Sequence, residues 1–140
     1  MKIYFLTLIA AGLLFSACNQ SKTDNSTAST TNAANAPVMK FEKETHDFGK
    51  IKAGEKVTYE FKFTNAGKSP LIISDAKASC GCTIPTWPHT PVKPGDNGAI
   101  KVIFDSATKV GLQDKQITIT ANTIPAQNIV HLIGEVQIPK

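Results

Sequence analysis

The feature that most constrains the fold is a strict alternation of apolar and polar side chains over residues 56–64. The large apolar members of this stretch are Val57, Tyr59, Phe61 and Phe63. Successive side chains of a β-strand point to opposite faces, whereas a helix would scatter these four around its circumference. The pattern therefore predicts a strand with one buried face and one solvated face.

Strands of the same kind account for most of the chain beyond residue 38. The other predicted strands are residues 39–42, 47–51, 71–77, 99–104, 116–121 and 129–136. Segments rich in Gly, Pro, Asn and Asp separate them, as expected for turns. About seven short strands without an amphipathic helix predict an all-β fold, an immunoglobulin-like antiparallel β-sandwich over residues 38–140. A small barrel is the alternative.

Composition limits the function classes that need to be considered. The 140 residues suit a single hydrophobic core. All 15 basic residues are Lys, and the net charge is only +4. Arg is the side chain best suited to bidentate contact with phosphate, and this chain has none. We therefore expect no nucleic-acid partner.

The N-terminus predicts export. Lys2 precedes an apolar run over residues 3–15 that is too short to cross a bilayer comfortably and ends in two small residues. Residues 1–17 are therefore interpreted as a cleaved signal peptide. The sequence Phe15-Ser16-Ala17-Cys18 resembles the lipobox of bacterial lipoproteins, which implies that Cys18 is acylated and becomes the new N-terminus. The alternative is an ordinary cleaved signal.

Acylation of Cys18 implies that the lipid bilayer is a partner and that the protein is anchored in the bacterial cell envelope. Asn19 occupies the position where an Asp would resemble an inner-membrane retention signal, so the outer membrane is the expected location. Residues 18–37 consist mostly of Asn, Gln, Ser, Thr and Ala and predict a flexible tether. Such a tether has a root-mean-square span of about 25 Å.

Several spaced motifs over residues 41–136 resemble the bacterial domain of unknown function 1573. The residues that carry the resemblance are Thr45-His46-Asp47-Phe48-Gly49-Lys50-Ile51, Gly54, Asn65-Ala66-Gly67, Ser79-Cys80-Gly81-Cys82-Thr83, Trp87, Pro91-Val92-Lys93-Pro94-Gly95 and Leu132-Ile133-Gly134-Glu135-Val136. That family resembles immunoglobulin-like domains of ciliary and sperm-protein-related modules. The resemblance implies a sandwich used for binding or scaffolding, and it leaves the activity open.

Two parts of the first motif have a structural interpretation. Phe48 is expected to fill the end of the sandwich, while Gly49 and the Gly54 turn permit a bulge or a positive φ. His46 precedes Asp47 at a strand entrance, and we expect an exposed side chain there rather than a catalytic one.

The Cys80-Gly81-Cys82 sequence poses the main chemical question. With Cys18 acylated, two of the three cysteines remain, which suits a disulfide in an exported protein. In an extended strand their Cβ atoms would be too far apart to bond, so Gly81 must allow a turn, and the small ring would be strained and readily reduced. Two buried free thiols and a thiolate metal site are the alternatives.

A metal site would use Cys80 and Cys82 with His89 as a further ligand, and Cu(I) or Zn as the ion. Residues 83–91 contain three prolines, and a stiff loop of this kind can hold His89 near the thiols. The favoured interpretation of the same segment is that Trp87 packs as a lid on the end of the sandwich and His89 is solvated. No cofactor is expected in that case.

Catalytic motifs are absent from the sequence. His46, His89 and His131 have no motif context for a nucleophile or a general base, so we expect no enzyme activity. The triplet Asp105-Ser106-Ala107, in a predicted exposed turn, resembles an O-glycosylation acceptor of envelope proteins, with Ser106 as the modified residue; an ordinary β-turn is the alternative.

These observations together predict a non-catalytic, lipid-anchored envelope domain that presents its sandwich edges or end loops to an unknown envelope protein. Addition of a strand to an exposed edge is the expected mode of binding. The alternative function is a copper- or thiol-handling envelope protein that uses Cys80 and Cys82.

Overall fold

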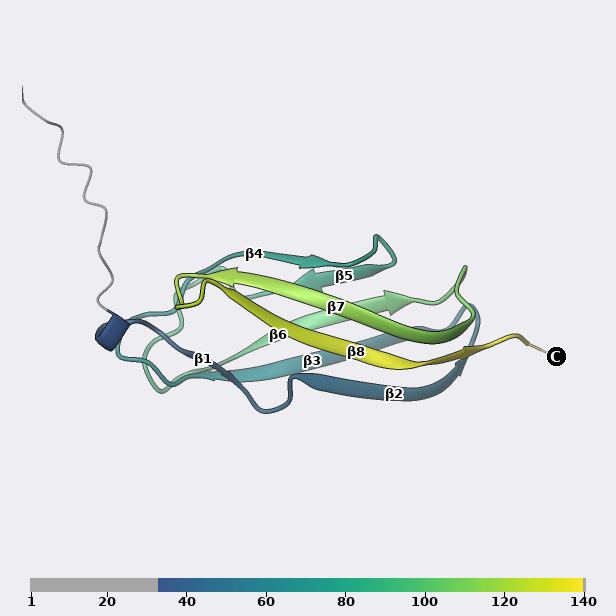
Figure 1. The fold of residues 1–140 in the computed structure, drawn as a ribbon, viewed down its shortest axis with the longest axis horizontal. Helices are drawn as coiled ribbons and strands as arrows, with labels where there is room; N and C mark the ends of the chain where they lie inside the picture. The colour runs from purple at the N-terminus through teal and green to yellow at the C-terminus, as the bar shows by residue number, and fades with distance from the viewer. Residues whose placement is uncertain (1–32, 140) are drawn as a thin grey trace, which may run out of the picture.

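The computed structural model describes residues 33–139 and contains eight strands in two four-stranded sheets, after a short 3₁₀ helix η1 (Ala33–Asn35) (Figure 1). The first sheet has the order β1 (Met39–Phe41), β3 (Lys56–Asn65), β6 (Asn97–Asp105), β5 (Thr83–Thr86). The second has the order β2 (Thr45–Lys52), β8 (Gln127–Gln137), β7 (Gly111–Ala121), β4 (Ile73–Ala78). The all-β immunoglobulin-like sandwich predicted from the sequence is confirmed.

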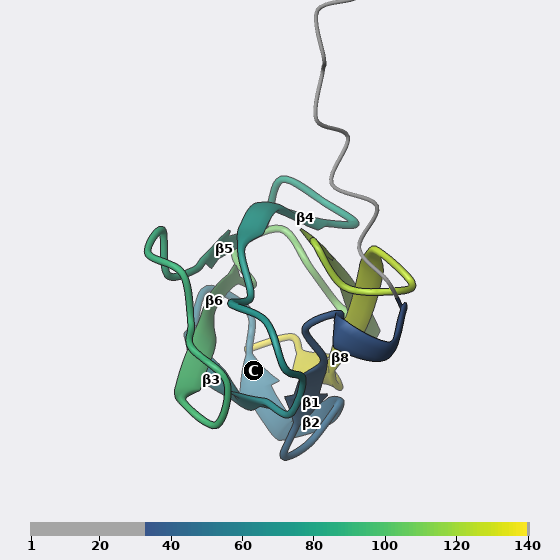
Figure 2. The same cartoon turned by 90° about the vertical axis from the view of Figure 1, so that its left-hand side faces the viewer.

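The core lies between the inward faces of the two sheets, as the view from the η1 end shows (Figure 2). On β3 the predicted alternation holds, because Phe61 and Phe63 are buried while the polar residues that alternate with the apolar ones, Lys56, Thr58, Glu60 and Lys62, are exposed. The fully buried apolar side chains from the neighbouring strands are Ile100, Val102, Phe104, Ile117, Ile119, Val130, Leu132 and Val136.

The structure corrects three details of the predicted topology. There are eight strands, because β5 lies in the Pro-rich segment that was interpreted as a loop. Strand β7 begins at Gly111, inside a predicted turn. The sequence pattern did not reveal this early start because residues 112–115 reverse the usual alternation: Leu112 faces solvent, while Gln113 and Lys115 lie on the same side as Ile117. The strands β2 and β8 pair in parallel, so the sheets are not entirely antiparallel.

The predicted bulge at Phe48 and Gly49 is confirmed. The pairing of β2 with β8 shifts register between Asp47 and Lys50, and Gly49 adopts a φ of 74°. The Phe48 ring turns inward, where its centroid lies 5.6 Å from that of Phe104. It also covers Gly134 of β8 so closely that a Cβ on Gly134 would lie 2.3 Å from the Phe48 ring.

The folded part begins earlier than residue 38. Ala36 is buried, and the backbone of residues 36–38 passes directly over Gly67, where a side chain would have no room. The side chain of Asn65 fastens this segment by accepting hydrogen bonds from the backbone N–H groups of Val38 (3.3 Å) and Gly67 (3.0 Å). The predicted signal peptide, Cys18 and most of the tether lie outside the described residues. No helix within residues 33–139 has the length and apolar character of a membrane span.

Replacement of Gly134 by Ala is expected to lower the free energy of unfolding by about 1–3 kcal/mol, because the new methyl group overpacks the Phe48 ring. Urea unfolding followed by tryptophan fluorescence measures the change. The matched control is Gly81→Ala, where a Cβ meets nothing within 4 Å. Equal stability of both variants would contradict the close packing of Phe48 on β8.

Candidate functional site

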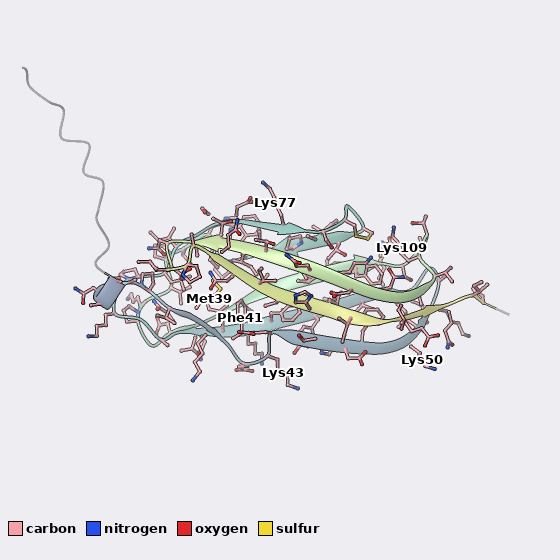
Figure 3. The ribbon with its side chains drawn as sticks, viewed as in Figure 1. Met39, Phe41, Lys43, Lys50, Lys77 and Lys109 are labelled. Atoms are coloured by element: carbon pink, nitrogen blue, oxygen red, sulfur yellow. A yellow bond between two sulfur atoms is a disulfide. The ribbon has the colours of Figure 1, made fainter. Side chains whose placement is uncertain are left out.

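Cys80 and Cys82 are joined by a disulfide in the connection between β4 and β5, at the opposite end of the sandwich from η1 (Figures 1 and 3). Their Cα atoms are 5.3 Å apart. In an extended strand the separation would be about 6.6 Å, so the turn at Gly81 draws them together as the sequence required. Of the three predicted states of this pair, the structure contains the disulfide.

The surroundings of the disulfide are partly buried and partly open. Cys82 packs against the hydrophobic core, and its carbonyl accepts a 2.8 Å hydrogen bond from the N–H of Asp105. The buried hydroxyl of Thr83 lies 3.7 Å from the sulfur of Cys80 and 3.9 Å from that of Cys82. Gly81, at the tip of the turn, is exposed.

The structure does not bring His89 to the cysteines. Residues 83–86 form β5, which runs away from the disulfide for about 13 Å, and His89 lies three residues farther on. Within residues 33–139 no group of three or more His, Cys, Asp or Glu side chains is placed to hold a metal ion. Trp87 packs against the core, as the lid interpretation predicted, and His89 is exposed with its ring 5.4 Å from that of Trp87.

Ser106 is buried, which corrects the prediction of an exposed turn. Its side chain has 0% exposure, and its Oγ donates a 2.6 Å hydrogen bond to the carbonyl of Glu55 and accepts a 3.1 Å bond from the N–H of Gly54. The carbonyl of Lys52 lies 3.2 Å away. The hydroxyl that the glycosylation hypothesis needs therefore ties the β6–β7 connection to the β2–β3 turn.

Removing this hydroxyl should destabilise the end of the sandwich that carries the disulfide. Ser106→Ala is expected to lower the free energy of unfolding by about 1–3 kcal/mol, because the part-buried hydrogen bonds between Ser106 and the backbone of Gly54 and Glu55 are lost. The control is Ser74→Ala on the exposed side of β4, which should change stability by less than about 0.5 kcal/mol. Thermal and urea unfolding measure both, and a Ser106 variant as stable as its control would refute this role.

The histidines on β2 and β8 have structural partners. The His46 ring stacks on Tyr59 with centroids 3.5 Å apart, so His46 is half-buried instead of exposed. Desolvation, and then the charge of Lys43, hold the pKa of His46 below its usual value. His131 lies 2.8 Å from an Asp114 carboxylate oxygen on the outer face of the second sheet.

A mostly apolar hollow lies on the outer face of the second sheet, over the β2 bulge. Leu112 and Ile133 line it together with Gly49 and Gly134. Leu112, the second residue of β7, is 87% exposed, an unusual exposure for a large apolar side chain within a strand. Val110 and Ile138, at the start of β7 and after the end of β8, are also exposed, so apolar surface gathers at this end of the molecule. Such patches commonly mark binding surfaces.

The rim of this hollow is polar and contains more acidic than basic groups. Lys50 forms a 3.4 Å ion pair with Glu135 (Figure 3 labels Lys50). Asp47 also lines the hollow, and in the described part of the chain it has no ion pair. One of its carboxylate oxygens accepts a 2.8 Å hydrogen bond from the N–H of Gly49.

Sequence reasoning missed the hollow and the inward-facing Lys115. Leu112, which lines the hollow, and Lys115 lie in the stretch that reverses the alternation, and the predicted strand therefore began only at residue 116. The sequence does contain one sign of an earlier strand start: the apolar residues Val110 and Leu112 are spaced two apart shortly before the predicted strand at residues 116–121.

All four edge strands carry features that oppose addition of another strand. β1 has three residues, β2 has its bulge, β4 shifts register between Ile73 and Asp75, and β5 contains Pro85. Short length, bulges and proline are the usual protections of sheet edges. The hollow is therefore a better candidate binding surface than the edges.

Comparison with known proteins identifies the family. Residues 39–136 match the family described as "Protein of unknown function (DUF1573)". The chain belongs to this family. Among curated proteins, none matches the chain. The DUF1573 match indicates no catalytic family for this domain.

Solved structures share the fold of this DUF1573 domain. A Porphyromonas gingivalis W83 protein of unknown function has a TM-score of 0.64 at 19% identity, covering 74% of this chain and 48% of that chain. The chain thus spans about half of that protein. The ASH/PapD-like domain 7 of human CEP192 has a TM-score of 0.57 at 8% identity, covering 94% and 100%. The VesB protease of Vibrio cholerae has a TM-score of 0.54 at 12% identity, covering 76% and 33%.

Proposed function

We propose that this DUF1573 protein is a non-catalytic, lipid-anchored domain of the bacterial cell envelope that binds another envelope protein through the hollow at Leu112 and Ile133. The observation that carries the binding role is the 87% exposure of Leu112 beside a preformed apolar hollow. The lipobox-like sequence that ends in Cys18 supports the anchoring role, and Asn19 favours the outer membrane.

The chemistry of the hollow specifies the kind of partner. Its apolar lining suits one apolar side chain of a protein segment, and burial of such a side chain contributes about 1.5–3 kcal/mol. The carboxylate of Asp47 on the rim favours a Lys or Arg next to that side chain. The expected partner segment therefore combines an apolar anchor with an adjacent basic residue.

The position of the hollow suits a tethered protein. The chain enters the domain at η1, whereas the start of β7 and the end of β8 lie at the other end of the sandwich (Figure 1). A lipid attached through the N-terminal segment leaves this far end directed away from the anchor, where a partner has free access. Copper or zinc binding receives no comparable support, because no ligand set is assembled in residues 33–139.

Site-specific cross-linking tests the binding role. A photoreactive amino acid at position 112 in cells is expected to trap one envelope protein, and Ile133→Glu should abolish that cross-link by placing a charge in the hollow. The matched control position is Ile84, which is also exposed (59%) but lies on β5 of the other sheet. Mass spectrometry identifies the trapped protein.

The binding role is contradicted if positions 112 and 84 give the same cross-links, or if Ile133→Glu leaves the trapped protein unchanged. Circular dichroism of the Ile133→Glu variant confirms that its fold is retained, so that loss of the cross-link reports the surface itself.

Anchoring is tested separately by Cys18→Ser. The variant is expected to lose incorporation of a fatty-acid analogue and to leave the membrane fraction, because the acyl chains supply the membrane affinity at about 0.8 kcal/mol per buried CH₂. The control is the double variant Cys80→Ser/Cys82→Ser, which should remain acylated and in the membrane fraction. Continued acylation of Cys18→Ser would contradict this site.

A further inference from the structure

The Cys80–Cys82 disulfide belongs to neither the anchor nor the hollow, and its placement differs from that of a structural bridge. It closes a ring across a single residue, and a loop this short contributes least to constraining the unfolded chain. The strands on either side have their own ladders, β4 with β7 and β5 with β6. Opening the disulfide therefore removes no strand pairing.

The two cysteines are both partly buried but differ in their contact with the core. Cys82 packs against the core, whereas Cys80 is not among the residues packed there. A side chain on Gly81 would meet nothing within 4 Å, so the tip of the turn is open to solvent. Attack on Cys80 would make Cys82, the cysteine that packs against the core, the leaving group.

Cations lie at this end of the sandwich. The pairing of β4 with β7 ends at Ala78 and Ile117, and beyond it the N–H of Ser79 donates a 2.9 Å hydrogen bond to the carbonyl of Gln116. Cys80 and Lys115 are the next residues along the two segments. The Nζ of Lys115 is 5.4 Å from the centre of the Phe104 ring, and Phe104 pairs with Thr83.

A second cation reinforces the first. Burial, and then the charge of Lys109, lower the pKa of Lys115. Lys109 projects from the β6–β7 connection at the same end as the disulfide (Figure 3). Nearby cations stabilise a thiolate and attract an incoming one.

We propose that Cys80–Cys82 is a thiol–disulfide exchange site that accepts two electrons from an external protein or small-molecule dithiol. A thiolate of the dithiol attacks the sulfur of Cys80, the Cys80–Cys82 bond breaks, and Cys82 leaves as a thiolate. The second thiol of the partner, once deprotonated, then attacks its own sulfur in the mixed disulfide and releases Cys80. The partner ends as a disulfide, and its two protons end on Cys80 and Cys82.

Thr83 and Lys115 act as positioning residues in this exchange. The Thr83 hydroxyl, 3.9 Å from the sulfur of Cys82, donates a hydrogen bond to the thiolate that forms there. Lys115 contributes positive charge on the inward side of the loop. Stabilising the leaving thiolate speeds exchange, because rates rise as the leaving thiol becomes more acidic. This activity is independent of the proposed binding hollow.

The site of attack is tested on the full-length chain carrying Cys18→Ser, so that Cys80 and Cys82 are the only cysteines. The folded protein is mixed with reduced glutathione, quenched with acid at short times, alkylated and mapped by mass spectrometry. Glutathione is expected on Cys80 and the alkyl group on Cys82. An adduct on Cys82, or no reaction until urea is added, would overturn the proposal.

The roles of Thr83 and Lys115 are tested by the rate of reduction with dithiothreitol. Thr83→Val and Lys115→Met are each expected to slow the reaction about three- to tenfold, the effect of losing one hydrogen bond or one nearby charge at the leaving thiolate. Lys77→Met, an exposed Lys on β4 paired with Asp75, is the matched control and should leave the rate unchanged.

Far-UV circular dichroism before and after reduction should show the same β-sheet spectrum. If the sandwich unfolds when the disulfide is reduced, or if both variants react at the control rate, the disulfide is a structural bridge and the proposal is wrong.

Discussion

Burial of one apolar face by each sheet is the constraint on which the rest of the molecule depends. The rings of Phe61 and Phe63 on β3 leave water only when a second sheet covers them, and the inward residues of β7 and β8 supply that cover. Once the sheets are stacked, every connection must lie at one of two ends. This places the disulfide loop, the β2–β3 turn and the β6–β7 connection together at the end opposite η1, although these segments are far apart in the sequence.

Buried polar side chains then hold the connections at both ends. Asn65 is fully buried and uses both ends of its amide: it accepts bonds from Val38 and Gly67, and it donates to the carbonyls of Ser69 (2.8 Å) and Val92 (2.9 Å). Ser106 has the same role at the other end. A buried polar group is costly unless its hydrogen bonds are made, so these residues allow essentially one arrangement of the loops they join. The disulfide loop and the apolar hollow are thus presented on a rigid support.

The fold was largely predictable because its strongest signals are local. Strict alternation identified β3, and the Phe48–Gly49 pair predicted a bulge that the register of β2 against β8 confirms. The errors fell where tertiary contacts override local patterns. Prolines favoured a loop over residues 83–86, yet the segment pairs with β6 as an edge strand, where the missing N–H of Pro85 is tolerated. Ser106 has the composition of an exposed turn and is buried only because the β2–β3 turn folds onto it.

The sequence by itself determined the class of fold, the family motifs and the need for a turn at Gly81 if Cys80 and Cys82 are to form a disulfide, because each depends on residues close together in the chain. Only the tertiary structure decided which distant groups meet. β5 carries His89 away from the cysteines, β7 places Lys115 over the Phe104 ring, and the pairing of β2, β8 and β7 assembles the hollow around Leu112 and Ile133. Strand register sets these juxtapositions, and register follows from packing of the whole core, which no short stretch of sequence contains.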